Sequence, residues 1–415
     1  MDKTAEKLYR EREKRITDAI QLKIPDRVPI IAGMGYFPGK YTGIPFAAAW
    51  YDYDKWLAAY KKTLQDFQPD MINVQPFFPG KAMEYLEPRS MRWPGHGVSP
   101  YHSHQSIEEE YMKVDEYDAF MKDPSDFMLR VYMSRISGVT AGLNILPELS
   151  SIGYSFMGAQ VLAEALAKPE LARTIRALQK AGREIRKWRS KMRAFHKMIA
   201  DMGFPPLTRG FAMAPFDAIS HSMRGMQGSF LDMYRQPDKL LEACEKLLAI
   251  TLDRPLPPPR NGANIRVFIP LTRGSDDFMS LKQFEKFYWP TLKRLIDVLI
   301  EKGAIPCIFF EGNFISRLEY FLDLPRGRIL AQLDSTDIFK AREILKGHMC
   351  IKGNVPSSLL QVGTVQEVKD YCKKLIDVVG KDGGFILAPR SSTDEVNPEN
   401  LKAMIEFTKE YGRYR

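Results

Sequence analysis

The stretch Ala304-Ile-Pro-Cys-Ile-Phe-Phe-Glu-Gly-Asn313 is an apolar run that ends at a charged residue. The same device returns three times: Arg328–Leu333 ends at Asp334, His348–Lys352 at Gly353-Asn354, and Gly384–Ala388 at Pro389-Arg390. Helical stretches of about ten to fifteen residues separate these runs, and alternating strands and helices are typical of a parallel sheet covered by helices. We therefore predict an α/β fold, a (β/α)8 TIM-type barrel, whose strand ends face one common mouth.

The composition suits one large domain. The chain has 415 residues, 45% of them hydrophobic, so a single barrel can span residues 1–415. Residues 1–23 have the pattern of an amphipathic helix and form an N-terminal extension. Residues 80–130 are rich in Pro, Gly, His and Trp with little periodicity, which predicts a cap or lid inserted into the barrel.

Charge and cysteine content exclude several classes of protein. The net charge is +9, but the basic residues are spread through helical stretches such as Thr174–Lys197 and alternate with apolar positions, as on a solvated face. We expect no nucleic-acid partner. No apolar run reaches the ~18–20 residues of a membrane span, and the charged N-terminus is unlike a signal peptide, so we expect a cytoplasmic protein without a membrane partner. The four cysteines lack a Cys-x-x-Cys pair, which argues against disulfides or a zinc knuckle.

Several short segments occur in an order and spacing that resemble the uroporphyrinogen decarboxylase (URO-D) superfamily. They cover residues 264–410: Gly274-Ser-Asp-Asp277, Tyr288-Trp-Pro290, Gly312-Asn313, Asp334-Ser-Thr-Asp337, Gly353-Asn-Val-Pro356, Gly363-Thr-Val-Gln-Glu-Val368, Gly383-Gly-Phe-Ile-Leu-Ala388 and Asn397-Pro-Glu-Asn400. Thr42-Gly-Ile-Pro-Phe-Ala-Ala-Ala-Trp-Tyr-Asp52 extends the resemblance towards the N-terminus. The resemblance implies one TIM-type barrel over nearly the whole chain.

Departures from the family pattern separate its branches. The decarboxylase pattern implies an aspartate after the second strand and an Arg-rich N-terminal loop, and here these places read Gln75-Pro76 and Tyr36–Tyr41. The chain therefore resembles the corrinoid-linked methyltransferase branch more closely. That branch implies zinc held by a His-x-Cys and a later Cys, but the matching positions are Phe309, Glu311 and Arg390. We do not expect a thiol-activating zinc site.

Three residues are candidates for catalysis. Glu311 follows a buried run, where desolvation disfavours its ionised form unless a cation such as Arg390 partners it. It could act as a general acid or as a ligand; the structural alternative is an internal Glu311–Arg390 pair that only holds the barrel together. Asp334 is expected to face the mouth, whereas Asp337 is expected to cap the following helix. His221 can act as acid or base near neutral pH.

A second group of residues is expected to bind the substrate or, in a minority interpretation, a metal. The substrate-binding candidates are Arg390, Asn354, Gln75, Asp276, Tyr36 and Arg273. Asp276 also fits a routine helix-capping sequence before a Phe-rich helix. His102 and His104 are spaced to chelate a metal, but a third ligand, His96 or Glu108, would have to fold back towards them.

The first functional hypothesis is a corrinoid-dependent methyltransferase. It would move a methyl group between a small donor, such as a methoxylated compound, a methylamine-like compound or a pterin, and a partner corrinoid protein that carries the cobamide. The alternatives are a lyase that decarboxylates an acid smaller than uroporphyrinogen, with Arg390 and Arg273 on its carboxylate, and a non-catalytic tetrapyrrole- or corrinoid-binding barrel. The sequence leaves homodimer formation open.

Overall fold

The structure, a computed structural model, describes residues 2–73, 78–153, 156–258, 263–391 and 393–414. Within these ranges eight strands run parallel around a central axis. In chain order they are β1 (Ile31–Gly33), β2 (Met71–Asn73), β6 (Gly210–Phe211), β7 (Arg266–Leu271), β8 (Ile305–Phe310), β9 (Leu330–Leu333), β10 (Cys350–Val355) and β11 (Phe385–Pro389). Each pairs in parallel with its neighbour from β6 to β11, and β1 pairs in parallel with β2.

Two short parallel contacts join these sheets into a ring. Ile30 bridges to Leu387 of β11, where the Leu387 N–H donates to the carbonyl of Pro29 at 2.9 Å. On the other side, Ile72 of β2 bridges to Pro206, just before β6. The predicted (β/α)8 TIM-type barrel is confirmed.

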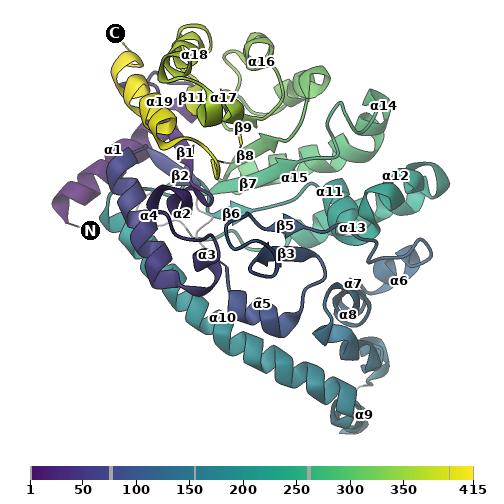
Figure 1. The fold of residues 1–415 in the computed structure, drawn as a ribbon. Coiled ribbons are helices and arrows are strands. Elements are labelled where there is room, and N and C mark those ends of the chain that lie inside the picture. The colour runs from purple at the N-terminus through teal and green to yellow at the C-terminus, as the bar shows by residue number, and fades with distance from the viewer. Residues whose placement is uncertain (1, 74–77, 154–155, 259–262, 392, 415) are drawn as a thin grey trace.

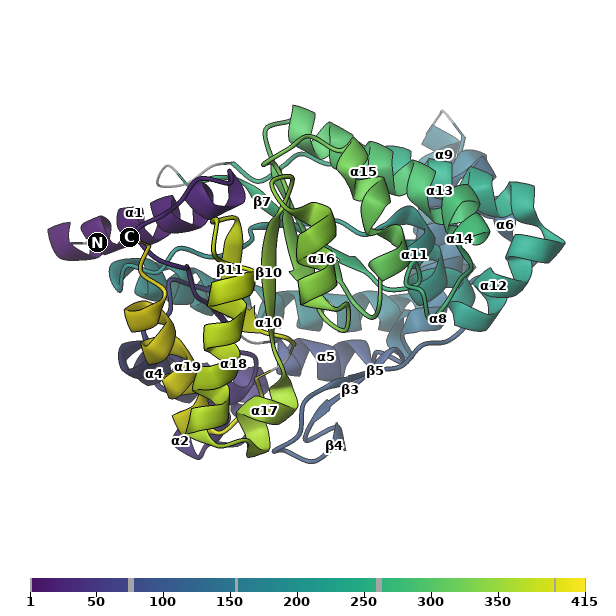
Figure 2. The ribbon, with the colours of Figure 1, turned by 90° about the horizontal axis from the view of Figure 1, so that it is seen from above.

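The barrel interior is filled near the N-terminal ends of its strands. One buried cluster combines inward-facing residues from most of the strands with α1 (Lys3–Ile20): Ile16, Ala19, Ile20, Ile31, Met71, Leu207, Ile305, Cys307, Leu330, Cys350, Ile386 and Ala388. Arg266 of β7 also lies in this region and forms an ion pair with Glu13 of α1. Helix α1 therefore closes the bottom of the barrel, and the opposite end carries the mouth. In Figure 2, α1 lies at one end of β10 and β11 and α17 at the other.

Helices surround the barrel (Figure 1) and bury a larger apolar layer between themselves and the strands. The helices of the N-terminal part and of the barrel's second half are α2 (Phe37–Thr42), α3 (Ala48–Tyr51), α4 (Tyr53–Phe67), α11 (Pro215–Ile219), α12 (Gly225–Arg235), α13 (Pro237–Leu252), α14 (Leu281–Gln283), α15 (Trp289–Glu301), α16 (Ile338–Leu345), α17 (Ser357–Val362), α18 (Val365–Val378) and α19 (Pro398–Tyr411). Asp337 caps α16 through the N–H groups of Phe339 and Lys340, as predicted. None of the described helices is long and apolar enough to cross a bilayer.

A long excursion separates β2 from β6. It contains α5 (Gly80–Leu86), a small sheet of β3 (Met91–Pro94), β4 (Gly97–Val98) and β5 (Gln105–Ser106), then α6 (Tyr117–Lys122), α7 (Pro124–Asp126), α8 (Met133–Ile136), α9 (Phe156–Ala167) and α10 (Pro169–Asp201). Figure 1 shows α10 running along one side of the molecule, with α9 at its far end. The excursion thus continues well beyond residue 130.

One predicted boundary needed correction: the strand predicted to end at Lys352 extends to Val355. The apolar run Phe211–Phe216 is divided between two elements, since β6 ends at Phe211 and α11 begins at Pro215. Helix α10, Pro169–Asp201, contains the predicted helical stretch Thr174–Lys197.

Candidate active site

The strand register brings the ends of β7 to β9 together at the mouth. Glu311 follows β8, and its N–H donates to the carbonyl of Leu271 in β7 at 3.0 Å. Asp334 follows β9, and its N–H donates to the carbonyl of Phe310 in β8 at 3.2 Å. Side chains at the C-terminal strand ends of such a barrel share one mouth. Glu311 and Asp334 are therefore neighbours.

Arg390 has a different partner from the one predicted. Its Nε donates to Asp334 Oδ1 at 3.0 Å, and its Nη2 donates to Ser335 Oγ. The predicted Glu311–Arg390 pair is wrong, because Asp334 stands on the intervening strand and takes the guanidinium. Asp334 thus has a positively charged partner.

Glu311 is left without a hydrogen bond or ion pair to its carboxylate from the residues that the structure describes. The Glu311 side chain is exposed at the mouth, but the surrounding protein partly shields it from water, and this desolvation raises its pKa. The negative charges of Asp334 and Asp217 raise the pKa further, and Arg273 acts in the opposite direction. Asp334 is paired with Arg390 and Glu311 is not, so the two neighbouring carboxyl groups stand in different environments.

This electrostatic arrangement predicts a pH-dependent stability difference for Glu311→Gln. A carboxyl with a raised pKa holds its proton more tightly in the folded protein, so wild-type stability falls as pH rises through the ordinary and the raised pKa. We expect the variant to melt at a Tm higher by the order of 1 °C at pH 7–8 and at the same Tm at pH 4. Thermal melts at the two pH values check this, and a lower Tm at pH 8 would show that Glu311 is stabilised by a partner.

Asn354 does not stand at a strand end. It lies inside β10 with its side chain buried, and its Nδ2 donates to the carbonyl of Asp334 at 3.3 Å. Gly353 before it also lies within β10, with a φ of +145° that residues with a Cβ rarely adopt. The Asn354 amide thus supports the turn that carries Asp334, and its role in substrate binding stays a prediction.

A buried carboxylate organises the turn after β7. Asp217 of α11 is 1% exposed and accepts from the N–H groups of Thr272 and Arg273, both at 3.0 Å, and from the Tyr288 hydroxyl at 2.6 Å. Burial raises the pKa of Asp217, and these three donors oppose the rise. The contacts fix the start of the loop that carries Arg273.

His221 lies against this loop. Its Nε2 is 2.5 Å from Thr272 Oγ1, and its Nδ1 is 3.4 Å from Arg273 Nη2. Burial lowers the pKa of His221, as does the charge of Arg273, whereas Asp217 and Glu108 raise it. A guanidinium only donates, so Nδ1 accepts in the Arg273 contact, whereas the Glu108 carboxylate 3.5 Å away suits a proton on the same nitrogen. The lowered pKa favours the neutral imidazole, which can take up a proton.

Arg273 connects the barrel to the excursion. It is nearly buried; its Nε donates to Ser220 Oγ at 3.0 Å and its Nη2 donates to Glu108. Glu108 also accepts from the N–H of Met226 at the start of α12 and lies 3.5 Å from His221 Nδ1. Through Glu108, the segment after β5 therefore contacts the rim of the mouth.

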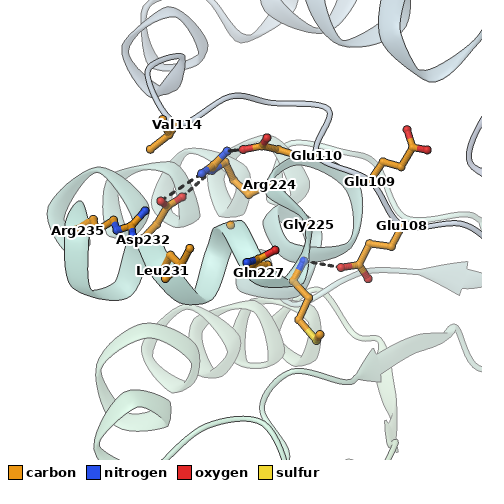
Figure 3. Close-up of a pocket in the computed structure, with 12 residues that line it drawn as sticks. Glu108, Glu109, Glu110, Val114, Arg224, Gly225, Gln227, Leu231, Asp232 and Arg235 are labelled. Carbon is orange, nitrogen blue, oxygen red and sulfur yellow. Dashed lines mark hydrogen bonds and ion pairs between the residues drawn. The ribbon is translucent and has the colours of Figure 1, made fainter.

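Beyond Glu108 lies a hollow of about 530 Å³ between residues 108–114 and α12, shown in Figure 3. Three of its charged side chains are paired with one another, since Arg224 donates to both Asp232 and Glu110. The Glu108 carboxylate accepts from the backbone of α12. Glu311 at the barrel mouth has no such partner among the described residues.

Asp276 is occupied by contacts within the protein. It forms an ion pair with Arg317 and accepts from Ser316 Oγ at 2.7 Å, while Asp277 accepts from the N–H of Asn313 at 3.2 Å. Both carboxylates fasten the turn after β8. The contacts favour a structural role for Asp276 over the predicted substrate contact.

Tyr36 and His104 contact each other away from Glu311's strand. The Tyr36 hydroxyl accepts from Trp50 Nε1 at 2.9 Å and lies 2.9 Å from His104 Nδ1. His102 is exposed. The part of the chain that the structure describes brings no third metal ligand to the two histidines. The candidate third ligands have other partners, Glu108 with Arg273 and His96 with Glu84 at 3.2 Å.

Gln75, another predicted substrate-binding residue, lies outside the described residues.

Two residues of this site, Asp217 and Glu108, were not among the candidates predicted from the sequence. Asp217 directly follows the apolar run Phe211–Phe216, the same signal that nominated Asp334, and the signal could have been applied to it. Glu108 carries no comparable signal, because its partner Arg273 is 165 residues away in the chain.

Comparisons with known proteins bear on the family and the fold of the chain. A family model described as uroporphyrinogen decarboxylase (URO-D) matches residues 156–411, more than half of the chain. A uroporphyrinogen decarboxylase from Chlorobaculum parvum is 25% identical over 186 residues, 43% of this chain and 51% of that protein. One from Chlorobium phaeovibrioides is 29% identical over 138 residues, 32% of this chain and 38% of that protein. The alignment thus spans about half the length of the first of these curated relatives.

A solved structure covers far more of the chain. A methyltransferase from Methanosarcina mazei superposes with a TM-score of 0.60 over 96% of this chain and 98% of its own, at 15% sequence identity. At that identity the likeness establishes a shared fold.

Proposed function

The chain belongs to the uroporphyrinogen decarboxylase family, and on that basis we propose that it is a methyltransferase that works with a partner corrinoid protein. The methyl donor is a small methoxylated compound, methylamine-like compound or pterin held in the barrel mouth. The observation that carries the proposal is the unpartnered Glu311, with its raised pKa, beside the Asp334–Arg390 pair. The fold shared with a methyltransferase supports it.

Glu311 acts as the general acid in this proposal. The partner's corrinoid supplies the nucleophile that accepts the methyl group. As the bond between the methyl carbon and the donor's oxygen or nitrogen breaks, the electron pair stays on that atom and Glu311 gives it a proton. A raised pKa keeps more of the acid protonated near neutral pH, which is the condition for this transfer. Solvent at the exposed carboxylate then restores the proton.

The charged neighbours position the donor. Arg390 holds Asp334 beside Glu311, and the Asp334 charge in turn keeps the proton on Glu311. His221, which contacts Thr272 in the loop after β7, can assist as an acid or base. These roles use side chains that follow β8, β9 and β11 and one from the helical turn after α11.

The thiol-activating zinc of related methyltransferases does not fit these residues. Its expected ligand positions hold Phe309, Glu311 and Arg390, which include neither a thiolate nor an imidazole. Cys307 lies buried inside the barrel, and burial raises its pKa to about 12, so that it stays a thiol. We route no step through zinc.

We further propose that residues 80–130 act as a cap over the mouth. Glu108, from this segment, contacts Arg273 on the barrel and lies beside His221, which supports a cap that closes on the site. A closed cap would exclude water from the reacting group.

Decarboxylation is the second candidate, favoured by the family model and by the curated relatives that carry that name. In this alternative, Arg273 and Arg390 bind the carboxylate of an acid smaller than uroporphyrinogen. A non-catalytic corrinoid-binding barrel would bind cobamide tightly and would be indifferent to Glu311→Gln.

A methyl-transfer assay distinguishes these candidates. The purified chain is incubated with a reduced corrinoid protein from the same organism and with methoxylated, methylamine-like and pterin donors, and the corrinoid absorbance is followed. We expect methylation with one donor class. Carbon dioxide release from an organic acid, without corrinoid methylation by any donor, would contradict the methyltransferase proposal in favour of the lyase.

A further inference from the structure

Lys352 is a cation buried in the wall of the barrel. It lies in β10, is 2% exposed, and its Nζ donates to Gln332 Oε1 of the neighbouring β9 at 2.7 Å. In the strand register Lys352 lies opposite Gln332, and Gln332 lies opposite Phe309 of β8. On the other side Lys352 lies opposite Ile386 of β11, a member of the interior cluster. Lys352 therefore belongs to an interior layer with one amide and apolar neighbours.

This lysine lacks the carboxylate partner that three arginines at the strands have. Arg266 has Glu13, Arg273 has Glu108 and Arg390 has Asp334. No described carboxylate lies within ion-pair distance of Lys352. A buried ammonium whose hydrogen-bond partner is a neutral amide is costly, because no described anion stabilises its charge. An incoming anion would supply the missing interaction.

Solvent reaches this level of the interior. Phe268 lies two residues after Arg266 and Phe309 two residues after Cys307, so both rings face the barrel interior. Phe268, Phe309 and Gln332 are only partly buried. Phe211 of β6 is 63% exposed. The rings of Phe211, Phe268 and Phe309 follow one another with centroids 6.3 and 6.2 Å apart. They form an accessible aromatic wall, the kind of surface that binds a flat apolar group.

The wall links the buried cation to the proposed acid. Glu311 lies just beyond the end of β8 and two residues after Phe309, a separation of at most about 7 Å along the strand direction. A molecule one ring in length spans that distance. An acid lying on Phe309 with its carboxylate towards Gln332 would present its far end to Glu311.

We propose that the barrel interior binds the carboxylate end of a flat organic acid through Lys352 and Gln332, with its ring on Phe268 and Phe309. This inference rests on the proposed function and deepens it, since it names the class of the methyl donor as an organic acid with an apolar body. Gln332 is suited to the contact because its Oε1 is used by Lys352 and its amide N–H groups remain for an anion. Burial lowers the pKa of Lys352 to about 7, and a bound carboxylate would favour its charged form.

Calorimetric titration of the full chain with benzoate and with the matched neutral probe benzamide tests the proposal. We expect the wild type to bind benzoate at least tenfold more tightly than benzamide. Lys352→Met should abolish this preference and still bind benzamide, whereas Lys346→Met, which removes an exposed lysine paired with Asp382, should leave it unchanged. Equal binding of the two probes by the wild type, or a preference that survives Lys352→Met, would overturn the proposal.

A second variant, Gln332→Glu, keeps the test valid if the Lys352→Met protein does not fold. Gln332→Glu keeps the lysine and gives it an internal carboxylate, so it should also abolish the preference for benzoate. A retained preference in that variant counts against the site. The titrations contain neither corrinoid protein nor methyl donor, so failure of methyl transfer and failure of anion binding are separate results.

Discussion

Glu311→Gln is expected to reduce the rate of methyl transfer by ~10²–10⁴-fold, the contribution typical of a general acid. The amide keeps the size of the side chain but cannot release a proton to the leaving atom. The wild-type rate should fall as pH rises through the raised pKa of Glu311, and this fall should be absent in the variant. Initial rates of corrinoid methylation between pH 5 and 9 provide the measurement.

Two comparisons sharpen this experiment. Glu319→Gln alters an exposed glutamate in the helical turn after β8 and should leave the rate unchanged. With a donor whose leaving atom departs readily without a proton, Glu311→Gln should reduce the rate of methyl transfer much less than with an ordinary donor. A loss below threefold with the ordinary donor would remove Glu311 from the mechanism.

Glu13→Ala is expected to lower the free energy of unfolding by ~3–5 kcal/mol, the range for breaking a buried ion pair. Arg266 is 1% exposed, and its Nη1 and Nη2 donate to Glu13 Oε1 and Oε2 at 2.7 and 2.8 Å. The variant leaves this guanidinium in the barrel floor without a counter-charge. Urea denaturation followed by circular dichroism measures the change.

The matched control lies on the same helix. Glu11→Ala removes an exposed glutamate that faces Lys7 at 3.9 Å and should change the unfolding free energy by less than ~0.5 kcal/mol. The double variant Glu13→Leu with Arg266→Met should recover most of the loss, because it removes both charges. A loss of under ~1 kcal/mol for Glu13→Ala would mean that water reaches the pair.

The barrel could be predicted because its signals are local. An apolar run of strand length that ends at a charged residue marks β8, β9 and β11 within a few positions. The same logic placed Glu311 and Asp334 at the mouth, where the structure has them. At β10 the signal misled, because Gly353-Asn354 resembles a turn although both residues belong to the strand.

The partners at the mouth could not be predicted, because they depend on distances between strands. From the sequence, Arg390 could pair with Glu311 or with Asp334. The strand order β8-β9-β10-β11 puts Asp334, which follows β9, nearer to Arg390 than Glu311, which follows β8. The role of Glu108 depends on how the excursion folds back over Arg273. The lack of a carboxylate beside Lys352 is likewise a property of the assembled barrel.

The seam between β1 and β11 bears on how the chain folds. It joins Ile30 to Leu387, so its formation requires closure of a loop of more than 350 residues. Contacts of such separation form late, since their entropy cost is met only after local structure exists. We expect an open sheet of β6 to β11 to assemble first and the seam to close in the slowest step. Until the seam closes, β1 and β11 each have an unpaired edge, and the refolding yield should fall as protein concentration rises.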